Sequence, residues 1–345
     1  LINDAQNAFI DGQMWSSIML AALQVITAII LAFWAPGFHT ITSEKDEEAL
    51  KNARQSIPAS LMDALDKAAT QRHLLVATDF DGTLAPLVRN PRKAAPIPGS
   101  LEALDTLATI PHTKAAIVSG RDIAGLRKVA PVTRDVTLVG SHGAEISDSD
   151  HELTKHQRDL LKRLIEEVTQ TADSIPGATI EEKKYAVVLH TRTAQDPHEA
   201  KKRTVELEER LSAVPGVTLT RGKKVSEFAV INTTKDAALA SLAARWPTGA
   251  DAILYLGDDV TDEHIFTGLP ARITTPQTEI ITVKVGEGDT AAQYRIANEL
   301  EAAAVLDYLC EQRNHYANAH FTWKDRKQHR KDSRSRARRM AYSAD

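Results

Sequence analysis

The chain has 345 residues, with 42 Lys and Arg against 46 Asp and Glu, a formal charge of −4. This length allows two or three domains, and the ordinary fractions of charged (26%) and hydrophobic (43%) residues exclude wholesale disorder and fibrous architectures. The single cysteine, Cys310, excludes a disulfide scaffold and a multi-cysteine metal centre. Residues 311–345 carry +6, which leaves −10 for residues 1–310. We therefore expect no general binding of nucleic acid.

Residues 15–35 form an uncharged, hydrophobic stretch with a tryptophan at each end. As a helix it would be about 31 Å long, the thickness of a bilayer core. It is not typical of a secretory signal, because residues 1–14 contain two aspartates but no Lys or Arg. A membrane span, a helix buried against a partner, and an upstream stretch outside the working protein (residues 1–40) all stay open. If 15–35 span a membrane, the basic residues that follow, from Lys45 on, place the rest of the chain in the cytoplasm. We expect a cytoplasmic protein in either case.

The pattern changes along the chain from a polar connector to alternating strands and helices. Residues 41–72 are expected to form a helical connector that Pro58 interrupts. From residue 73 on, apolar β-rich runs alternate with amphipathic helical patterns; the runs lie at 73–80, 114–120, 136–141, 251–259 and 280–286, and the helical patterns at 100–109, 122–129, 235–246 and 262–269. This alternation predicts an α/β fold with a Rossmann-like, doubly wound parallel sheet. Such sheets hold their ligands at the carboxyl ends of the strands.

Residues 148–222 break the alternation, because two predicted strands follow each other directly. The predicted order is helix 155–172, strands 178–182 and 185–192, helix 197–213 and strand 216–220. We expect a separate α+β unit here, inserted into a core made of 73–147 and 223–310. The Arg- and Lys-rich residues 311–345 have little periodicity and are expected to be mostly disordered.

Two acidic motifs follow predicted buried strands. In "DFDGTLAPL" (79–87), Asp79 and Asp81 are two residues apart at a strand end. In "GDDVTDE" (257–263), four acidic residues fall within seven positions. Carboxylates held this close repel one another unless a cation or a proton neutralises them, so each motif indicates a divalent-cation site. The alternatives are an ordinary Asp-Gly turn and a solvated helix start.

Two further residues could hold phosphate oxygens. Ser119 in "VSGR" follows a strand, and Lys235 in "INTTKDAAL" lies at a predicted helix start. A hydroxyl and an ammonium at such positions can bind a phosphate. Each could equally be a helix cap or a surface charge.

The order Asp-x-Asp-Gly-Thr, Ser, Lys, Gly-Asp-Asp-x-x-Asp resembles the four-part signature of the haloacid dehalogenase superfamily of phosphotransferases. More narrowly, "DFDGTLAPL", "VSGR", "GSHGAE", "GKKVSE" and "GDDVTDE" resemble the trehalose-6-phosphate phosphatase family. The resemblance covers about residues 73–310. One departure is Asp236, at a position where the family usually has glycine after the motif lysine.

The resemblance implies Mg²⁺-dependent hydrolysis of trehalose 6-phosphate through an aspartyl-phosphate. Asp79 would be the nucleophile, and Asp81 would protonate the leaving sugar oxygen and then take a proton from water. Ser119 and Lys235 would stabilise the charge of the transferring phosphoryl group.

The resemblance also implies a ligand set for Mg²⁺. Asp79, the backbone carbonyl of Asp81 and Asp258 would bind the ion, which prefers oxygen ligands. Asp259 and Asp262 would lie behind these ligands and support them.

The inserted unit would be a cap that closes over the sugar. Lys223 and Glu227 are four residues apart, a spacing that places both side chains on one face of a strand, as a clamp on sugar hydroxyls requires. A simple cross-strand ion pair is the alternative. Further candidates for substrate binding are Arg121, His142, Glu145, His190 and Arg192; the last two could instead be a surface pair.

Two other functions stay open. The chain could be a phosphatase for another sugar phosphate, such as sucrose phosphate or mannosyl-phosphoglycerate, or an inactive, membrane-held sugar-phosphate sensor. The intact pair Asp79 and Asp81 argues against a sensor. We expect a separate trehalose-6-phosphate synthase as the pathway neighbour, because the 72 residues before the core are too few for a glycosyltransferase.

Overall fold

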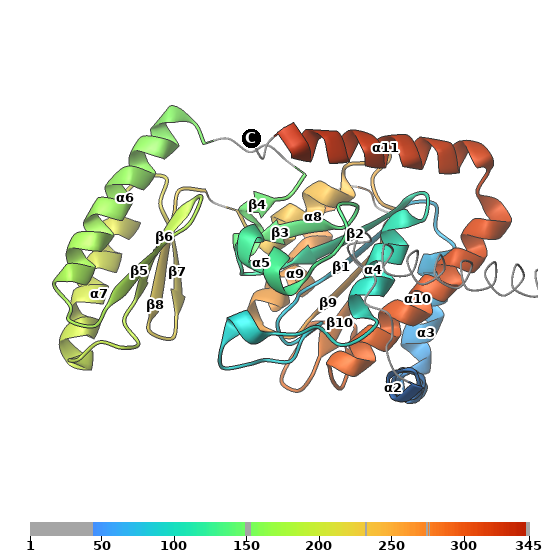
Figure 1. The fold of residues 1–345 in the computed structure, drawn as a ribbon, viewed down its shortest axis with the longest axis horizontal. Helices are drawn as coiled ribbons and strands as arrows, with labels where there is room; N and C mark the ends of the chain where they lie inside the picture. Colours follow the sequence, from blue (N-terminus) through green and yellow to red (C-terminus); the bar gives the residue numbers. More distant parts are fainter. Residues whose placement is uncertain (1–43, 149–152, 232, 274, 276, 343–345) are drawn as a thin grey trace, which may run out of the picture.

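The computed structural model describes residues 44–342 apart from 149–152, 232, 274 and 276. The expected span at 15–35 lies outside these residues, and none of the described helices is long and apolar enough to cross a membrane. The described chain forms a core and a smaller unit beside it, drawn at the left of Figure 1.

The core is built on a seven-stranded sheet in the order β11-β10-β9-β1-β2-β3-β4. Its strands are β1 (Leu74–Thr78), β2 (Thr113–Val118), β3 (Thr137–Gly140), β4 (Glu145–Ile146), β9 (Ala252–Gly257), β10 (Glu279–Val285) and β11 (Tyr294–Ile296). All neighbours are parallel except β3 and β4. The predicted doubly wound sheet is therefore confirmed, with the short β4 and β11 added. The strand order reverses at β1, and α/β sheets hold ligands beside such a reversal.

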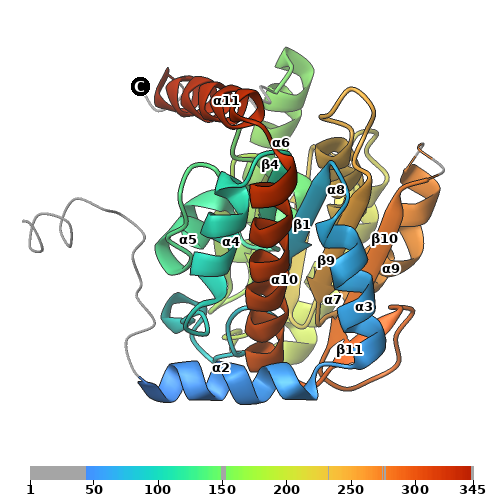
Figure 2. The ribbon, with the colours of Figure 1, turned by 90° about the vertical axis from the view of Figure 1, so that its right-hand side faces the viewer.

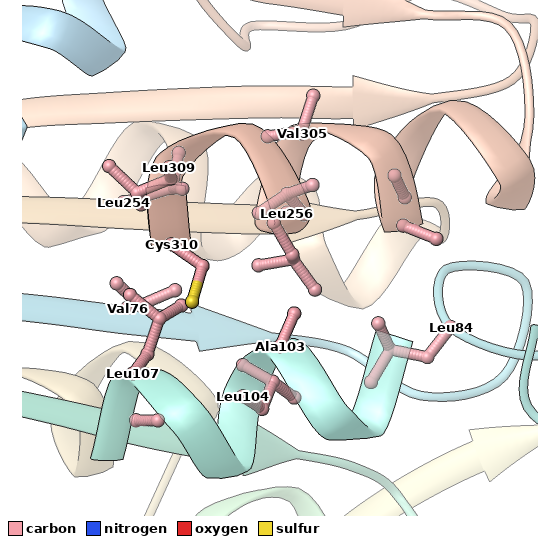
Figure 3. Close-up of a cluster of buried hydrophobic side chains, with 14 of the residues drawn as sticks. Val76, Leu84, Ala103, Leu104, Leu107, Leu254, Leu256, Val305, Leu309 and Cys310 are labelled. Carbon is pink, nitrogen blue, oxygen red and sulfur yellow. The ribbon is translucent and has the colours of Figure 1, made fainter. Parts of the chain in front are cut away.

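Helices cover both faces of this sheet. One face carries α3 (Ala59–Ala69), α4 (Ser100–Thr109) and α10 (Glu299–His320), and the other carries α8 (Lys235–Ala243) and α9 (Val260–Arg272). Along β1, Leu74 and Val76 pack with the first group, whereas Leu75 and Ala77 pack with the second. Burial on both faces is why residues 74–77 of this strand are all apolar instead of alternating with polar ones. Figure 3 shows part of the first cluster, between α4, α10 and the sheet, with Cys310 inside it.

Two more helices complete the core. The connector forms α2 (Glu44–Ser56), and α3 begins directly after Pro58. Proline suits this position because it cannot continue the preceding helix but can lead into a new one. Figure 2 shows α2 crossing one end of α10. The short α5 (Ile123–Val129) follows β2, and the side chain of Asp122 caps it by accepting a hydrogen bond from Gly125 N.

The inserted unit is a four-stranded antiparallel sheet with two helices on one face. It contains α6 (Lys155–Asp173), β5 (Thr179–Glu182), β6 (Ala186–His190), α7 (Pro197–Ser212), β7 (Thr218–Gly222) and β8 (Val225–Ala229), and the strand order is β5-β6-β8-β7. Val187, Leu189 and Phe228 pack against the helices. The helices lie on the side away from the core, so the other face of the sheet is turned toward it (Figure 1).

The boundary of this unit differs from the expectation. Strand β8 pairs with both β6 and β7, so it belongs to the inserted sheet. The insertion therefore runs through Ala229, and the expected return to the core at residue 223 is too early. The hairpin between β7 and β8 is closed by the two residues Lys223 and Lys224, which the sequence pattern did not separate from the following strand.

The expectation of a disordered tail is also wrong for residues 311–342. Helix α10 continues to His320, and α11 (Trp323–Tyr342) follows it. Helix α11 has no apolar stripe to reveal it, because it docks through polar contacts at the amino ends of the core strands. These contacts are His112 Nε2 to Asp325 Oδ1 (2.9 Å), His329 Nε2 to the carbonyl oxygen of Ala108 (3.0 Å) and Ser333 Oγ to Asp135 Oδ1 (2.6 Å). Figure 2 shows α11 across the end of α10 that is opposite α2.

Candidate active site

The loops that follow the core strands surround a cavity of about 500 Å³. It lies at the carboxyl ends of β1, β2, β3 and β9, the edge that the sequence predicted. The cavity brings together eight of the predicted residues: Asp79, Asp81, Ser119, Arg121, His142, Lys235, Asp258 and Asp259. The exposed side chains of Leu87 and Val88 form part of its wall.

A buried lysine lies between two buried carboxylates at the centre of the site. Lys235 Nζ donates to Asp79 Oδ1 (2.9 Å) and to Asp262 Oδ1 (2.8 Å). Burial raises the pKa of Asp79 to about 8, with Lys235 opposing the rise and Asp262 adding to it. Burial alone would lower the pKa of Lys235, but the two carboxylates raise it, so the ammonium stays charged. The side chains are thus held in one arrangement by charge as well as by packing.

Asp262 is fully buried and its carboxylate already accepts four hydrogen bonds. Besides Lys235, the hydroxyl of Tyr255 donates to Oδ1 (2.7 Å), and the backbone N–H groups of Asp258 and Asp259 donate to Oδ2 (3.1 Å each). A carboxylate in this state holds its neighbours in place and has little capacity for another ligand. The side chain of Asp259 is exposed and accepts from Val260 N (2.6 Å) at the start of α9, so Asp259 joins the cluster through its backbone.

The acidic cluster fits a hard divalent cation. Asp79 and Asp258 each offer an oxygen, and an oxygen of Asp262, which its own hydrogen bonds occupy, lies within 4.8 Å of both. Lys235 takes Oδ1 of Asp79, which leaves Oδ2 for a metal ion. Burial raises the pKa of Asp258 to about 6, and Asp262 and Asp259 add to this rise. Oxygen ligands that repel one another in a partly buried site are the donors that Mg²⁺ prefers.

Gly82 allows Asp258 to approach the first motif. A Cβ atom at Gly82 would lie 2.0 Å from Asp258 Oδ2, and the φ of this residue is +85°. Both observations require glycine. The turn of the first acidic motif therefore also shapes the second.

Asp81 is held by a bidentate ion pair with Arg121. Arg121 Nε donates to Oδ2 of Asp81, and its Nη2 donates to Oδ1, both at 2.6 Å. The hydrogen bonds to Asp81 also raise the pKa of Arg121. Bidentate pairs of this kind are among the stronger polar contacts in proteins. Arg121 thus contacts a predicted catalytic residue directly, which the spacing of the motifs did not show.

The loop after β3 carries His142 into the cavity. His142 adopts a left-handed conformation with φ +53° and donates its backbone N–H to the carbonyl of Ser119 (3.1 Å). Burial and the charge of Lys235 lower the pKa of His142, so its imidazole is neutral at neutral pH. Glu145 lies behind this loop, where Oε1 accepts from Ser141 Oγ (2.6 Å). It is outside the cavity wall and supports the loop, in contrast to its expected contact with substrate.

The cap presents an ion pair that the sequence did not predict. Glu227 on β8 accepts from Lys183 Nζ (2.5 Å), and only 14% and 12% of these two side chains are exposed. Lys223 lies in the β7–β8 turn and is exposed, so it does not share a strand face with Glu227 as expected. Lys183 stands in the run "EEKK", where nothing in the pattern distinguishes it from Lys184.

His190 and Arg192 are placed away from the catalytic cavity. His190 Nε2 lies 3.0 Å from Glu181 Oε2 on the neighbouring strand β5. Arg192 is exposed in the segment after β6. His190 nevertheless lies on the same face of the cap sheet as Glu227, because Val187 and Leu189 point to the helices on the other face.

Asp236, the departure from the family pattern, is accommodated without disturbing Lys235. It lies in the first turn of α8, and its carboxylate pairs with the guanidinium of Arg272 on α9. Acidic side chains are favoured in the first turn of a helix. The contact joins two helices on the same face of the sheet.

The strand order, the inserted cap and the position of the acidic cluster place the chain among phosphatases of the haloacid dehalogenase fold. Residues 77–299 match the model of the family described as trehalose-phosphatase. The chain belongs to this family.

The chain is similar in sequence to several named proteins. The chain is 30% identical over 298 residues to a trehalose-phosphate phosphatase of Mycobacterium tuberculosis, covering 80% of this chain and 72% of that protein. It is 32% identical over 286 residues to a bifunctional trehalose-6-phosphate synthase/phosphatase of Thermoproteus tenax (79% of this chain, 37% of that protein). It is 33% identical over 257 residues to an uncharacterised glycosyl hydrolase of Mycobacterium tuberculosis (71% and 19%). The chain thus spans well under half of the last two relatives.

A solved structure of trehalose-6-phosphate phosphatase from Aspergillus fumigatus is similar to this one. The TM-score is 0.55 at 28% identity, and the match covers 74% of this chain and 97% of that chain. The family match ends at residue 299, so it does not include most of α10 or any of α11.

Proposed function

We propose that this chain hydrolyses trehalose 6-phosphate to trehalose and phosphate through an aspartyl-phosphate on Asp79. The observation that carries the proposal is the convergence of Asp79, Lys235 and Asp258 in one cavity beside Asp81. Membership of the trehalose-phosphatase family supports the choice of sugar.

In this mechanism Asp79 attacks phosphorus, and the bond from phosphorus to the sugar oxygen breaks. Asp81 protonates that oxygen as it leaves. In the second step it takes a proton from the water that attacks the aspartyl-phosphate, and the bond from phosphorus to the Asp79 oxygen breaks, which frees the carboxylate and releases phosphate. Lys235, which already contacts Asp79, would neutralise charge on the transferring group. Ser119 would donate its hydroxyl to a phosphate oxygen. Mg²⁺, held by Asp79, Asp258 and the backbone carbonyl of Asp81, would neutralise and orient the phosphate.

The Arg121–Asp81 pair gives this mechanism an order of events. While both oxygens of Asp81 accept from Arg121, the carboxyl cannot readily hold a proton for the sugar. An incoming phosphate competes for the same guanidinium. Arg121 would then turn from Asp81 to the phosphate, and Asp81 would become available as the acid.

The cap would supply the contacts to the sugar. Glu227 and Lys183 lie on the face of the cap sheet turned toward the core, since Phe228 and Val187 point to the helices on the other face. A charged pair of this kind can exchange its mutual contact for sugar hydroxyls. The charges of Glu227 and Lys183 also act on the pKa of His142, which would contact the substrate from the core side.

Phosphate release from a panel of sugar phosphates tests the proposal. Trehalose 6-phosphate, sucrose 6-phosphate and mannosyl-phosphoglycerate would be compared with Mg²⁺ and with EDTA. We expect the highest kcat/KM with trehalose 6-phosphate, and no turnover in EDTA. A higher value with another sugar would reassign the substrate, and binding without turnover of any of them would favour the sensor.

The setting of the enzyme follows from its substrate. We propose a cytoplasmic location, where sugar phosphates and Mg²⁺ are found, and a separate synthase that supplies trehalose 6-phosphate. The relative from Thermoproteus tenax, named as a fused synthase and phosphatase, supports this pathway neighbour.

A further inference from the structure

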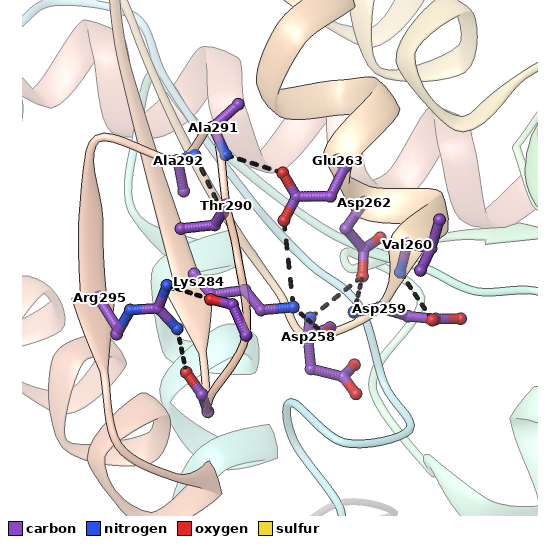
Figure 4. A network of polar contacts seen from close by, with 12 residues as sticks. Asp258, Asp259, Val260, Asp262, Glu263, Lys284, Thr290, Ala291, Ala292 and Arg295 are labelled. Atoms are coloured by element: carbon purple, nitrogen blue, oxygen red, sulfur yellow. Dashed lines mark hydrogen bonds and ion pairs between the residues drawn. The ribbon is translucent and has the colours of Figure 1, made fainter.

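Lys284 is a buried lysine near the carboxyl end of strand β10, and it reaches the loop that carries Asp258. It lies on β10, where it pairs with Gly257 of β9, the residue before Asp258. Only 7% of its side chain is exposed. Its Nζ donates to the backbone carbonyl of Asp258 (Figure 4).

Glu263 lies on the other side of the same ammonium. Its Oε1 lies 4.0 Å from Lys284 Nζ, and its Oε2 accepts from Ala291 N (2.9 Å). Glu263 belongs to the first turn of α9, so three segments meet at Lys284: the β9–α9 loop, β10 and the loop that follows β10 (Figure 4). The loop of Asp258 is thereby attached to the neighbouring strand by a side chain as well as by its own backbone.

Stability alone is a poor reason for a charge in this place. Replacing a buried ion pair by apolar side chains of similar volume is often neutral or stabilising. Val283 and Val285 on either side of Lys284 point to the opposite, apolar face of the sheet, so the lysine places a buried charge on the face that it shares with Thr282. A lysine here therefore points to a role toward the group it contacts.

We propose that Lys284 is a positioning residue for metal binding: it fixes the backbone of Asp258 so that the carboxylate stays directed at Asp79. This inference rests on the proposed function, because it concerns the Mg²⁺ of that reaction. Lys284 itself contacts neither substrate nor phosphate. Its effect passes through the Asp258 carbonyl.

Two roles for Lys284, as a positive charge near the metal and as a residue that positions Asp258, predict opposite changes in Mg²⁺ affinity when its side chain is made neutral. A nearby positive charge repels Mg²⁺, so on charge alone a neutral side chain would tighten metal binding. If Lys284 positions Asp258, the neutral side chain weakens it. Residues that orient metal ligands typically change metal affinity by roughly 10- to 100-fold.

The test is calorimetric titration of Mg²⁺ into the full chain without substrate. Lys284→Met keeps the length and packing of the side chain, and Lys284→Arg keeps the donor. Thr282→Val is the matched control: Thr282 lies two residues earlier on the same strand face, and its Oγ1 accepts from Gln293 N (3.0 Å), so it holds the same loop without contacting Asp258. We expect Lys284→Met to weaken Mg²⁺ binding by about 10-fold or more, Lys284→Arg to restore most of it, and the control to lower only the melting temperature.

Two results would overturn the inference. Equal or tighter Mg²⁺ binding by Lys284→Met would show that only its charge matters, and an equal loss in Thr282→Val would show a merely structural role. If Lys284→Met does not fold, Glu263→Gln removes the partner of the ammonium, and an unchanged Mg²⁺ affinity there overturns the inference as well. Because no substrate is present, a wrong assignment of the sugar leaves this experiment unaffected.

Discussion

Lys183 and Glu227 are the residues of the cap whose removal should separate sugar recognition from chemistry. Both side chains are largely buried and form a 2.5 Å ion pair. If they bind the sugar, Lys183→Met and Glu227→Gln each remove a charged hydrogen bond, worth about 1.5–3 kcal/mol. That corresponds to a loss of roughly 10- to 150-fold in kcat/KM for trehalose 6-phosphate. A small aryl phosphate has no sugar hydroxyls for the cap to contact, so its kcat/KM should change by less than about threefold.

Lys223→Met is the control that the structure provides, since Lys223 is exposed in the hairpin and does not contact Glu227. Its kcat/KM should match the wild type with both substrates. Steady-state kinetics with trehalose 6-phosphate and p-nitrophenyl phosphate, together with thermal melts, provide the measurement. Equal losses with both substrates in Lys183→Met would refute the reasoning and assign the pair to the fold of the cap. A large loss in Lys223→Met with the sugar phosphate alone would mean that the hairpin contacts the sugar after all.

Three further predictions concern the core. Asp79→Asn should abolish steady-state turnover while leaving the circular dichroism spectrum unchanged, because an amide cannot attack phosphorus; appreciable activity would exclude the covalent mechanism. The pKa values of Asp79 and Asp258 are raised from 3.8 to about 8 and about 6. The metal-free folded protein therefore keeps protons on these carboxyls that the unfolded chain has already lost. Their contribution to the free energy of unfolding falls as the pH rises from about 4 to about 8. Since Mg²⁺ binds only the ionised carboxylates, it should raise the melting temperature more at about pH 8 than at about pH 5.5, and the opposite order would contradict these shifts. Arg313→Met should lower the free energy of unfolding by about 3–5 kcal/mol in urea titrations. The fully buried guanidinium donates to the carbonyls of Ala69 and Arg72 and to Thr113 Oγ1, and all three would lose their donor. A change below about 1 kcal/mol would mean that other donors replace it.

The strands of the core and the edge that holds the site could be predicted from the sequence, because both depend on local pattern. Residues 74–77 of the run 73–80 are apolar at successive positions, which is typical of a strand buried on both faces, and the structure has β1 there between two layers of helices. Parallel strands all end at the same edge of a sheet. Residues as distant as Asp79, Lys235 and Asp258 were therefore expected to meet, and they line one cavity.

Only the tertiary structure determined which side chains from different helices, strands and loops form hydrogen bonds or ion pairs with one another. Lys183 and Lys184 are neighbours in one charged run, and only the register of β6 against β8 selects the first as the partner of Glu227. The β7–β8 turn places Lys223 away from that face, although its spacing from Glu227 would suit a continuous strand. Arg121 reaches Asp81 because β1 and β2 are neighbours in the sheet.

The same limit applies to residues 311–342. Local composition, with many basic residues and no apolar stripe, is typical of a solvated chain. Helix α11 nevertheless lies against the core, because Asp325 and Ser333 form hydrogen bonds with side chains at the amino ends of the core strands. The periodicity of apolar residues in a sequence indicates which side chains the hydrophobic effect will bury. It does not indicate polar contacts between segments that are far apart in the chain. Those contacts exist only once the fold has brought their partners within hydrogen-bonding distance.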